Sequence, residues 1–245
     1  MKTNRKIRIF NLVLVAFFIL IATNCKTVNE PIFGGTVSDV DGNAYHTVTI
    51  GNQTWMIENL KTTHYNDNTV IPLVTDSSKW NSLNTPGYCW YNNDSTKYKG
   101  TFGALYNWSA VNTSKLAPVG WHVPTVDEWI TLENNVTGYN YVSGSLAKIL
   151  AATSNWTKSA SISSVGNNLT VNNTSGFSAL PGGYRSTDSI PFNKIDSVGS
   201  WWTSSASDSI KSAWYCSMDY SLSTVQRGYN LKLNGYSVRC VKNTK

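Results

Sequence analysis

Apolar and polar positions alternate near the start of the chain and change to a helical spacing near its middle. Residues 45–50 alternate, 51–53 form a turn signal, and 54–60 are expected to return as a second strand, so a β-hairpin is predicted here. Farther on, Thr125 and Glu128 have the spacing of a capping box, and Trp129 and Ile130 continue an apolar face. This pattern predicts a helix from Val126 to about Val136.

A second, shorter helix is predicted at 146–151, and short strands separated by Gly, Asn and Ser follow Gly176. The predicted strands are 178–180, 201–204, 213–218, 224–229 and 237–241. Helices in the middle followed by a small-stranded half indicate the α+β class. With no internal repeat and no later linker, we expect a single domain at 36–243, preceded by a polar tether at 25–35.

The N-terminus has the pattern of an export signal. Four basic residues precede an apolar run at 9–22, which suits a signal peptide and is too short to cross a bilayer comfortably, so 1–24 is predicted to be removed. Residues 20–25 resemble a bacterial lipobox, although Asn24 stands where Gly, Ala or Ser is usual. We therefore expect lipid on Cys25 and attachment to the outer membrane, facing the periplasm or the cell surface. The alternative is an ordinary cleavage that leaves Cys25 incidental.

The charge of the chain is concentrated in this signal. Removing 1–24 takes away four positive charges and lowers the formal net charge from +6 to +2. No basic stripe remains, so a nucleic-acid partner is not expected.

The segment 176–185, GFSALPGGYR, has the most suggestive glycines in the chain. A phosphate loop needs a helix directly after its glycines, and here a polar stretch and Pro191 follow instead. The segment also lacks the second glycine of a nucleophile elbow. We predict that Pro181-Gly182-Gly183 is a tight passage of scaffold and that Arg185 is a structural hydrogen-bond donor.

The remaining chemistry points away from catalysis. The cysteines and histidines lack the CxxC, HxH and HExxH spacings of zinc sites, so no metal or cofactor is predicted, and few carboxylates are free for glycoside hydrolysis. Aromatic residues are the better candidates for a ligand site, and those singled out are Trp90, Tyr91, Trp202 and Tyr215. The alternative for each is core packing, since adjacent rings of one strand point to opposite faces.

Two possible modifications remain. Ser95, Ser189, Ser197 and Ser209 each follow an aspartate in the Asp-Ser/Thr-aliphatic (or Thr) pattern of a bacterial periplasmic O-glycosylation system. Besides Cys25, three cysteines remain in an oxidising compartment, namely Cys89, Cys216 and Cys240, which allows one disulfide and one free thiol.

Seven segments, in order, resemble the Fibrobacter succinogenes major paralogous domain family. They are DVDGNAYHTVTIGNQTWMIENLKT (39–62), YCWYNND (88–94), FGALYNWSAV (102–111), GWHVPTVDEW (120–129), GFSALPGGYR, WWTSS (201–205) and GYSVRCVK (235–242). The biochemical function of that family is unassigned, and its domains are common in exported lipoproteins. Cys89 and Cys240 lie in recurring blocks and Cys216 does not, so the resemblance favours a Cys89–Cys240 disulfide.

At greater distance, HVPTVDEW, LPGGYR and YSVRC are similar to blocks of formylglycine-generating enzymes, whose fold is related to C-type lectins. The resemblance implies an α+β domain of that kind, with irregular loops around small sheets. It does not carry the activity, because 184–200 contains no cysteine where those enzymes have a catalytic pair. The calcium-binding motifs of sugar-binding C-type lectins are absent as well.

These observations favour a non-catalytic binding or adhesion module, anchored by lipid in the cell envelope, with a glycan or a surface protein as its ligand. Two alternatives stay open: an enzyme on a formylglycine-generating-type scaffold, and a structural subunit of a surface fibre.

Overall fold

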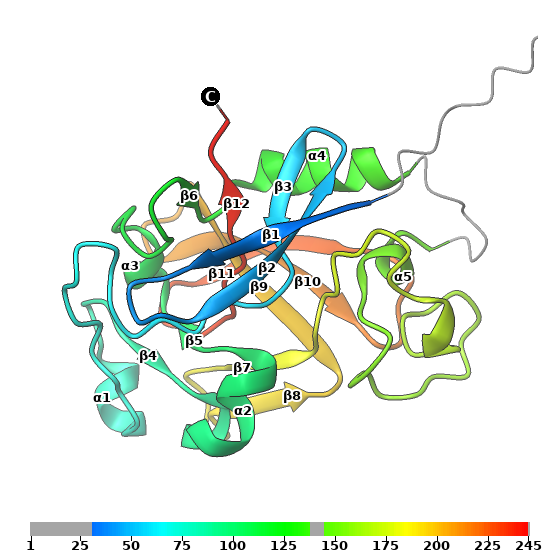
Figure 1. Cartoon of the computed structure of the whole chain (residues 1–245). Coiled ribbons are helices and arrows are strands. Elements are labelled where there is room, and N and C mark those ends of the chain that lie inside the picture. Colours follow the sequence, from blue (N-terminus) through cyan, green and yellow to red (C-terminus); the bar gives the residue numbers. More distant parts are fainter. Residues whose placement is uncertain (1–30, 138–144, 245) are drawn as a thin grey trace, which may run out of the picture.

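The computed structural model describes residues 31–137 and 145–244, so the predicted signal peptide and Cys25 lie outside the described residues. Two five-stranded sheets and a set of short helices form the domain (Figure 1). The α+β class predicted from the sequence is confirmed. In the described part of the chain, no helix has the length and apolar character needed to cross a bilayer.

The first sheet joins the two ends of the domain. Its order is β1-β2-β3-β12-β6, with antiparallel pairing throughout. The strands are β1 (Ile32–Ser38), β2 (Ala44–Ile50), β3 (Gln53–Met56), β12 (Val241–Lys242) and β6 (Trp121–His122). The predicted hairpin is therefore β2 and β3.

The second sheet contains most of the C-terminal half, in the order β11-β10-β9-β7-β8. Its strands are β7 (Gly182–Arg185), β8 (Phe192–Ile195), β9 (Val198–Ala206), β10 (Ser212–Asp219) and β11 (Gln226–Leu231). The pairing of β7 with β9 is parallel and the others are antiparallel. A small ribbon of β4 (Tyr88–Cys89) and β5 (Leu105–Tyr106) packs beside it.

Short helices fill the connections. They are α1 (Ser77–Asn81), α2 (Ser95–Phe102), α3 (Trp108–Val111), α4 (Val126–Val136) and α5 (Leu146–Leu150), with 3₁₀ turns η1 (Tyr91–Asn93) and η2 (Leu169–Val171). The two helices expected from the sequence are α4 and α5.

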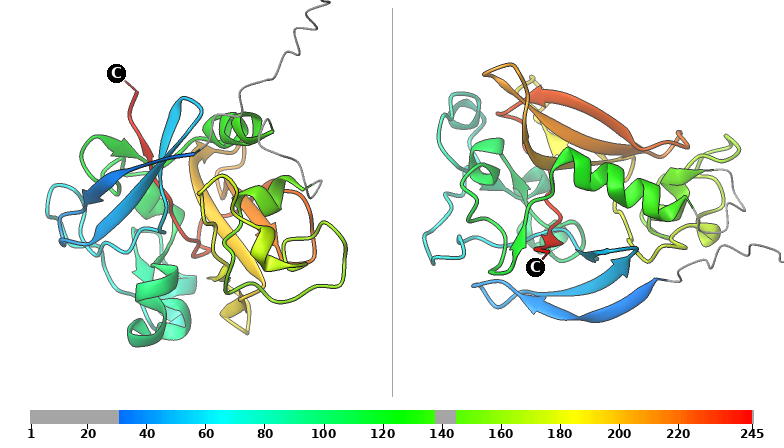
Figure 2. Two further views of the ribbon diagram at one scale, coloured as in Figure 1. Left: turned by 45° about the vertical axis from the view of Figure 1, so that its right-hand side comes forward. Right: turned by 90° about the horizontal axis from the view of Figure 1, so that it is seen from above.

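Helix α4 connects the two sheets. The predicted capping box is present: Thr125 Oγ1 accepts from the Glu128 N–H, and the Glu128 carboxylate accepts from the Thr125 N–H at 2.8 Å. Its apolar side contributes Trp129, Leu132 and Val136 to a buried cluster that also holds Val48 of β2 and Trp201 of β9. Seen from above, α4 lies between the N-terminal strands and the β9–β10 strands (Figure 2).

The predicted tight passage at Gly182-Gly183 is confirmed at Gly183. Its φ is +62°, and a side-chain Cβ would lie 2.5 Å from the backbone oxygen of Asn193. Arg185 is fully buried, and its guanidinium donates to the carbonyls of Val74, Thr75 and Asp76. The GFSALPGGYR segment is thus scaffold, as the sequence predicted, with Arg185 fastening the 74–76 loop.

The expected Cys89–Cys240 disulfide is absent from the structure. Cys89, Cys216 and Cys240 are separate, buried thiols, and each belongs to a different hydrophobic cluster. The sequence blocks that suggested the pairing mark positions in two different parts of the core. Burial raises the pKa of the Cys89 thiol to about 11, so that thiol is protonated and unreactive at neutral pH.

Three further expectations differ from the structure. Of the strand expected at 237–241, only Val241 belongs to a strand, β12. Strand β1 begins at Ile32, inside the region 25–35 expected to be a tether, because Thr36, Val37 and Ser38 pair with β2 and the pairing extends backwards past a bulge to Ile32. The strand expected at 178–180 is a single bridge from Ala179 to Ala151, and regular pairing starts only at Gly182.

Candidate functional site

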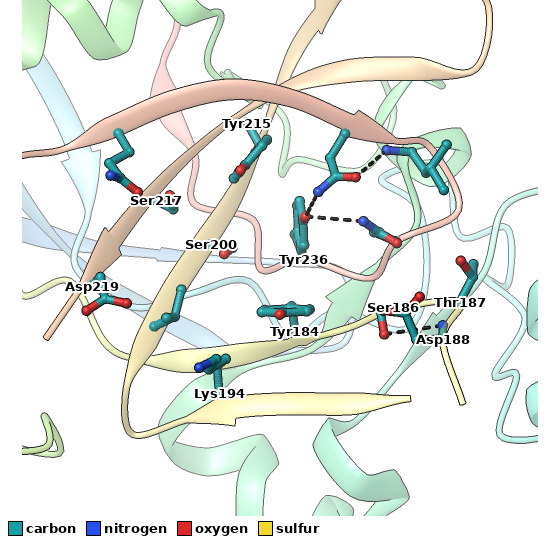
Figure 3. Close-up of a pocket in the computed structure, with 15 residues that line it drawn as sticks. Tyr184, Ser186, Thr187, Asp188, Lys194, Ser200, Tyr215, Ser217, Asp219 and Tyr236 are labelled. Carbon is teal, nitrogen blue, oxygen red and sulfur yellow. Dashed lines mark hydrogen bonds between the residues drawn. The ribbon is translucent and has the colours of Figure 1, made fainter. Parts of the chain in front are cut away.

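A pocket of about 330 Å³ opens on the second sheet, on the face that points away from α4 (Figure 3). This volume is at the lower end of the roughly 300–1,000 Å³ that small-molecule sites occupy. The lining residues are Tyr184, Ser186, Thr187, Asp188, Lys194, Val198, Ser200, Tyr215, Ser217, Asp219, Gln226, Asn230, Leu231, Asn234 and Tyr236.

Strand alternation selects which residues reach the pocket. In β10, Tyr215, Ser217 and Asp219 line it, whereas Cys216 and Met218 between them are buried in the α4-side cluster. Across the ladder Tyr215 pairs with Trp202 and Ser217 pairs with Ser200 of β9. Polar residues can therefore lie on one face while the other face forms the core.

Three tyrosines form the centre of the pocket. The Tyr236 ring packs on buried Trp202, with ring centroids 4.4 Å apart, and it contacts Tyr215 at 5.1 Å and Tyr184 at 6.0 Å. Tyr236 is buried, whereas Tyr184 and Tyr215 are half-buried. The two outer rings therefore offer aromatic surface to a ligand, and Tyr236 and Trp202 support them.

Backbone pairing fixes the segment that carries Tyr236. The Gly235 N–H donates to the Arg185 carbonyl, and the Gly235 carbonyl accepts from the Arg185 N–H. Ser237 exchanges similar bonds with β9. The Tyr236 hydroxyl accepts from Asn230 Nδ2 at 2.9 Å and from Asn234 Nδ2 at 3.2 Å. Because both acceptor positions of this oxygen are used, the hydroxyl can still donate one hydrogen bond to a further partner.

Tyr184 and Tyr236 are neutral at ordinary pH. Burial raises the pKa of Tyr184, and the negative charge of Asp188 raises it further. Burial likewise raises the pKa of Tyr236, against the smaller opposing effect of the bonds from Asn234 and Asn230. Both phenols act as hydrogen-bonding groups rather than as acids.

The two carboxylates stand at opposite ends of the pocket. Figure 3 shows Asp219 at one end and Asp188 at the other, with Lys194 between Asp219 and Tyr184 along the lower edge. One carboxylate oxygen of Asp219 is used by the N–H and hydroxyl of Ser221, at 2.8 and 2.6 Å. The two carboxylates are thus separated by the tyrosines.

The structure brings one of the four predicted ligand-contact aromatics into this pocket. Tyr215 lines it, and Trp202 is fully buried beneath Tyr236. Trp90 is buried in the cluster that also holds Trp202 and Tyr236, and Tyr91 is buried in another cluster. Neither lines the pocket, so core packing, the alternative, is what the structure shows for them. Neighbouring positions in the sequence do not reveal which ring of a pair remains accessible.

Tyr184 and Tyr236 were missed. A signal was present for Tyr184, since it directly precedes an arginine expected to point into the structure, and alternation sends it to the opposite face. Tyr236 lies in a loop with no periodic pattern, and only the pairing of that loop with β7 and β9 brings it to the pocket.

The histidines do not come together. Each pairs with a carboxylate in a different place: His46 with Glu58, His64 with Asp41, and His122 with Glu128, at 2.7, 2.5 and 2.7 Å. Across residues 31–137 and 145–244, no group of three His, Cys, Asp or Glu side chains is arranged to hold a metal ion.

The four candidate glycosylation serines are scattered over the surface. Ser95, Ser189 and Ser209 are exposed, and Ser197 is half-buried with its hydroxyl 3.2 Å from that of Thr157. Modification at these positions stays a prediction.

An α+β domain with a tyrosine-lined polar pocket on one sheet describes the class of protein that the fold and site define. The model of the Fibrobacter succinogenes major domain matches residues 48–242, so the chain belongs to that family. No curated protein and no solved structure matches the chain.

Proposed function

We propose that the chain is a non-catalytic binding module and that the pocket on the second sheet binds a neutral glycan. The observation that carries this proposal is the combination of two accessible tyrosine rings with a surrounding set of uncharged hydroxyls and amides. A sugar ring has apolar C–H faces that pack on aromatic rings and hydroxyls that need donors and acceptors around its edge.

The pocket residues divide in that way. The rings of Tyr184 and Tyr215 supply the stacking surface, while Ser200, Ser217 and Asn230 stand around them. The Tyr236 hydroxyl accepts hydrogen bonds from Asn230 and Asn234, so its own O–H donor is held in a fixed position. A donor that is already ordered reduces the entropy lost on binding. The charged lining residues are two aspartates and one lysine. The pocket therefore lacks the concentrated charge that an ionic ligand would need.

A glycan array followed by calorimetry tests the proposal. The purified chain is expected to bind a set of related neutral glycans saturably, without turnover. Tyr215→Ala should weaken that binding about tenfold or more, since truncation of a central aromatic commonly costs over about 1.4 kcal/mol. Ile162→Ala, which truncates an exposed apolar side chain outside the pocket, is the control and should leave this binding unchanged. Equal losses in both variants would contradict the proposal.

We further propose that Cys25 carries lipid and holds the domain on the outer membrane, so that the pocket faces ligands in the periplasm or outside the cell. The support is the lipobox-like sequence at 20–25 after an export signal. Mass spectrometry of the native N-terminal peptide should show an acylated Cys25, and Cys25→Ala should release the protein from the membrane fraction. An unmodified N-terminus at another residue would contradict it.

The finer likeness to C-type-lectin-like and formylglycine-generating-enzyme-like domains stays a prediction, supported by the shared HVPTVDEW, LPGGYR and YSVRC blocks. Superposing an experimental structure of this chain on such domains tests it.

A further inference from the structure

A second hollow lies on the opposite face of the β10–β11 hairpin. It has a volume of about 240 Å³ and is lined by Ser207, Asp208, Ser209, Trp214 and Tyr229. We call it the outer corner. Trp214 and Tyr229 are direct cross-strand partners, and alternation places them opposite the side that carries Tyr215.

The two rings form an accessible right-angled corner. Their centroids are 5.8 Å apart and their planes meet at 84°. Tyr229 is 65% exposed and Trp214 is only half-buried, although Cys216 and Met218, on the same face of β10, are completely buried. Exposing two large aromatics costs solvation free energy, and such surface is typical of a binding site.

The third wall of the outer corner is polar. The β9–β10 turn brings the hydroxyls of Ser207 and Ser209 and the carboxylate of Asp208 beside the rings. Asp208 is exposed and has no hydrogen-bond or ion-pair partner within the part of the chain that the structure describes. The buried indole of Trp202 donates its N–H to the Tyr106 carbonyl. Among the described residues, the Trp214 indole makes no such bond, so its N–H is available to donate to a ligand.

We propose that the outer corner is a second carbohydrate site, which takes a single neutral hexopyranose residue. One ring of the corner packs against the apolar C–H face of the sugar, and the carboxylate of Asp208 accepts from two neighbouring hydroxyls. The small volume and open walls fit one sugar residue held weakly, with a Kd on the order of 1 mM. This inference does not rest on the first pocket, because the two sites share no lining residue.

Fluorine NMR of the chain labelled with 5-fluorotryptophan tests the site directly. The probes are methyl β-glucopyranoside, methyl β-galactopyranoside and methyl α-mannopyranoside, and the Trp214 resonance is assigned with Trp214→Phe. At least one probe should shift that resonance saturably, whereas sorbitol, an acyclic polyol without a flat face, should not. The other tryptophan resonances report whether each variant remains folded.

Matched variants separate the two sites. Tyr229→Ala should weaken the Trp214 response about tenfold and Asp208→Asn severalfold, whereas Tyr215→Ala should leave it unchanged. The proposal is overturned if none of the three glycosides shifts the Trp214 resonance, if sorbitol shifts it equally, or if the response persists in both Tyr229→Ala and Asp208→Asn. If the unaltered chain binds no glycan in the first pocket and the Trp214 resonance still responds to a glycoside, only the proposed function is contradicted.

Discussion

The two faces of strands β9 and β10 differ in burial and in chemistry. On the α4 side, Trp201, Cys216 and Met218 are completely buried and pack among apolar side chains. On the other side, Tyr215 is half-buried beside the hydroxyls of Ser200 and Ser217, in an open pocket. Because these residues alternate along the same strands, one face stabilises the fold while the other presents hydrogen-bonding groups.

This difference separates two uses of aromatic residues. Trp201 and Trp202 are adjacent, yet Trp201 joins the α4-side core and donates to Asn59 Oδ1, whereas Trp202 supports the floor of the pocket. The composition of the chain, with ten tryptophans, therefore does not indicate a large aromatic binding surface. Most of these rings replace the aliphatic residues of an ordinary core.

The largest expected effect is the difference in unfolding free energy between a substitution on the buried face and one on the pocket face. Trp201→Ala should lower the free energy of unfolding by about 3–5 kcal/mol, because it leaves a large cavity and removes the indole hydrogen bond to Asn59 Oδ1. Tyr215→Ala, on the open face, should cost roughly 1–2 kcal/mol, since its ring is already half-exposed. Urea denaturation measures both. Equal losses would mean that the pocket face is also a closed core.

Gly183 tests whether the passage into the pocket strand is fixed. Gly183→Ala should lower the free energy of unfolding by about 2–3 kcal/mol, because it forces a side chain into a positive φ and against Asn193 O. The control is Gly35→Ala, where no atom lies within 4 Å of the added methyl and no positive φ is present. Thermal unfolding should place the control within about 0.5 kcal/mol of the parent. A harmless Gly183→Ala would show that the backbone of β7 has other conformations available.

Gly228 should separate binding from stability. It pairs with Tyr215, and a methyl there would lie 3.4 Å from the tyrosine ring, at normal contact distance. Gly228→Ala should therefore raise the free energy of unfolding by about 0.5–1 kcal/mol while restricting the Tyr215 ring and weakening the glycan binding severalfold. Gly100→Ala, in the open on α2, should give a similar gain in stability with unchanged binding. Identical binding in both variants would remove the Tyr215 ring from the site.

The smallest effect is a pH dependence away from both faces, at the start of α4. The hydrogen bond that His122 donates to Glu128 raises the pKa of His122. Burial opposes the ionisation of Glu128, but the hydrogen bonds that it accepts from His122 and Thr125 lower its pKa overall. The raised histidine pKa stabilises the fold below its ordinary value of 6.5, and this contribution is lost as pH rises through the folded value. The lowered carboxyl pKa stabilises above 4.5 and is lost as pH falls through the folded value.

Between about pH 4.5 and 6.5 the His122–Glu128 pair should therefore contribute most, by less than about 1 kcal/mol because both side chains are partly exposed. His122→Gln should flatten this part of the stability profile, measured by urea denaturation across pH. The binding of the first pocket should be unaffected. An unchanged profile would show that the pair adds nothing to the fold.

The sequence predicted the parts of the fold whose signals are local. The α4 capping box, the β2–β3 hairpin and the glycine passage each depend on residues a few positions apart, and each is present, although β3 ends at Met56 rather than at 60. Strand β1 was missed because its glycines and exposed side chains resemble a linker, and only pairing with β2 makes it a strand. The disulfide was mistaken because order in the sequence does not show which cluster a cysteine joins.

The pocket was less predictable than the fold. Tyr215 was singled out, but its partners come from two separate segments: β7 supplies Tyr184, and the loop after β11 supplies Asn234 and Tyr236. Their convergence depends on the parallel pairing of β7 with β9 and on the bonds of Gly235 to Arg185. Such long-range contacts leave no periodic pattern in a single sequence.

The most direct test is a crystal structure of the chain with the strongest ligand from the glycan array. The account predicts a sugar ring packed against Tyr184 or Tyr215, with the Tyr236 hydroxyl donating a hydrogen bond to a ligand hydroxyl. Ligand density elsewhere on the molecule, with the tyrosine pocket empty, would contradict it.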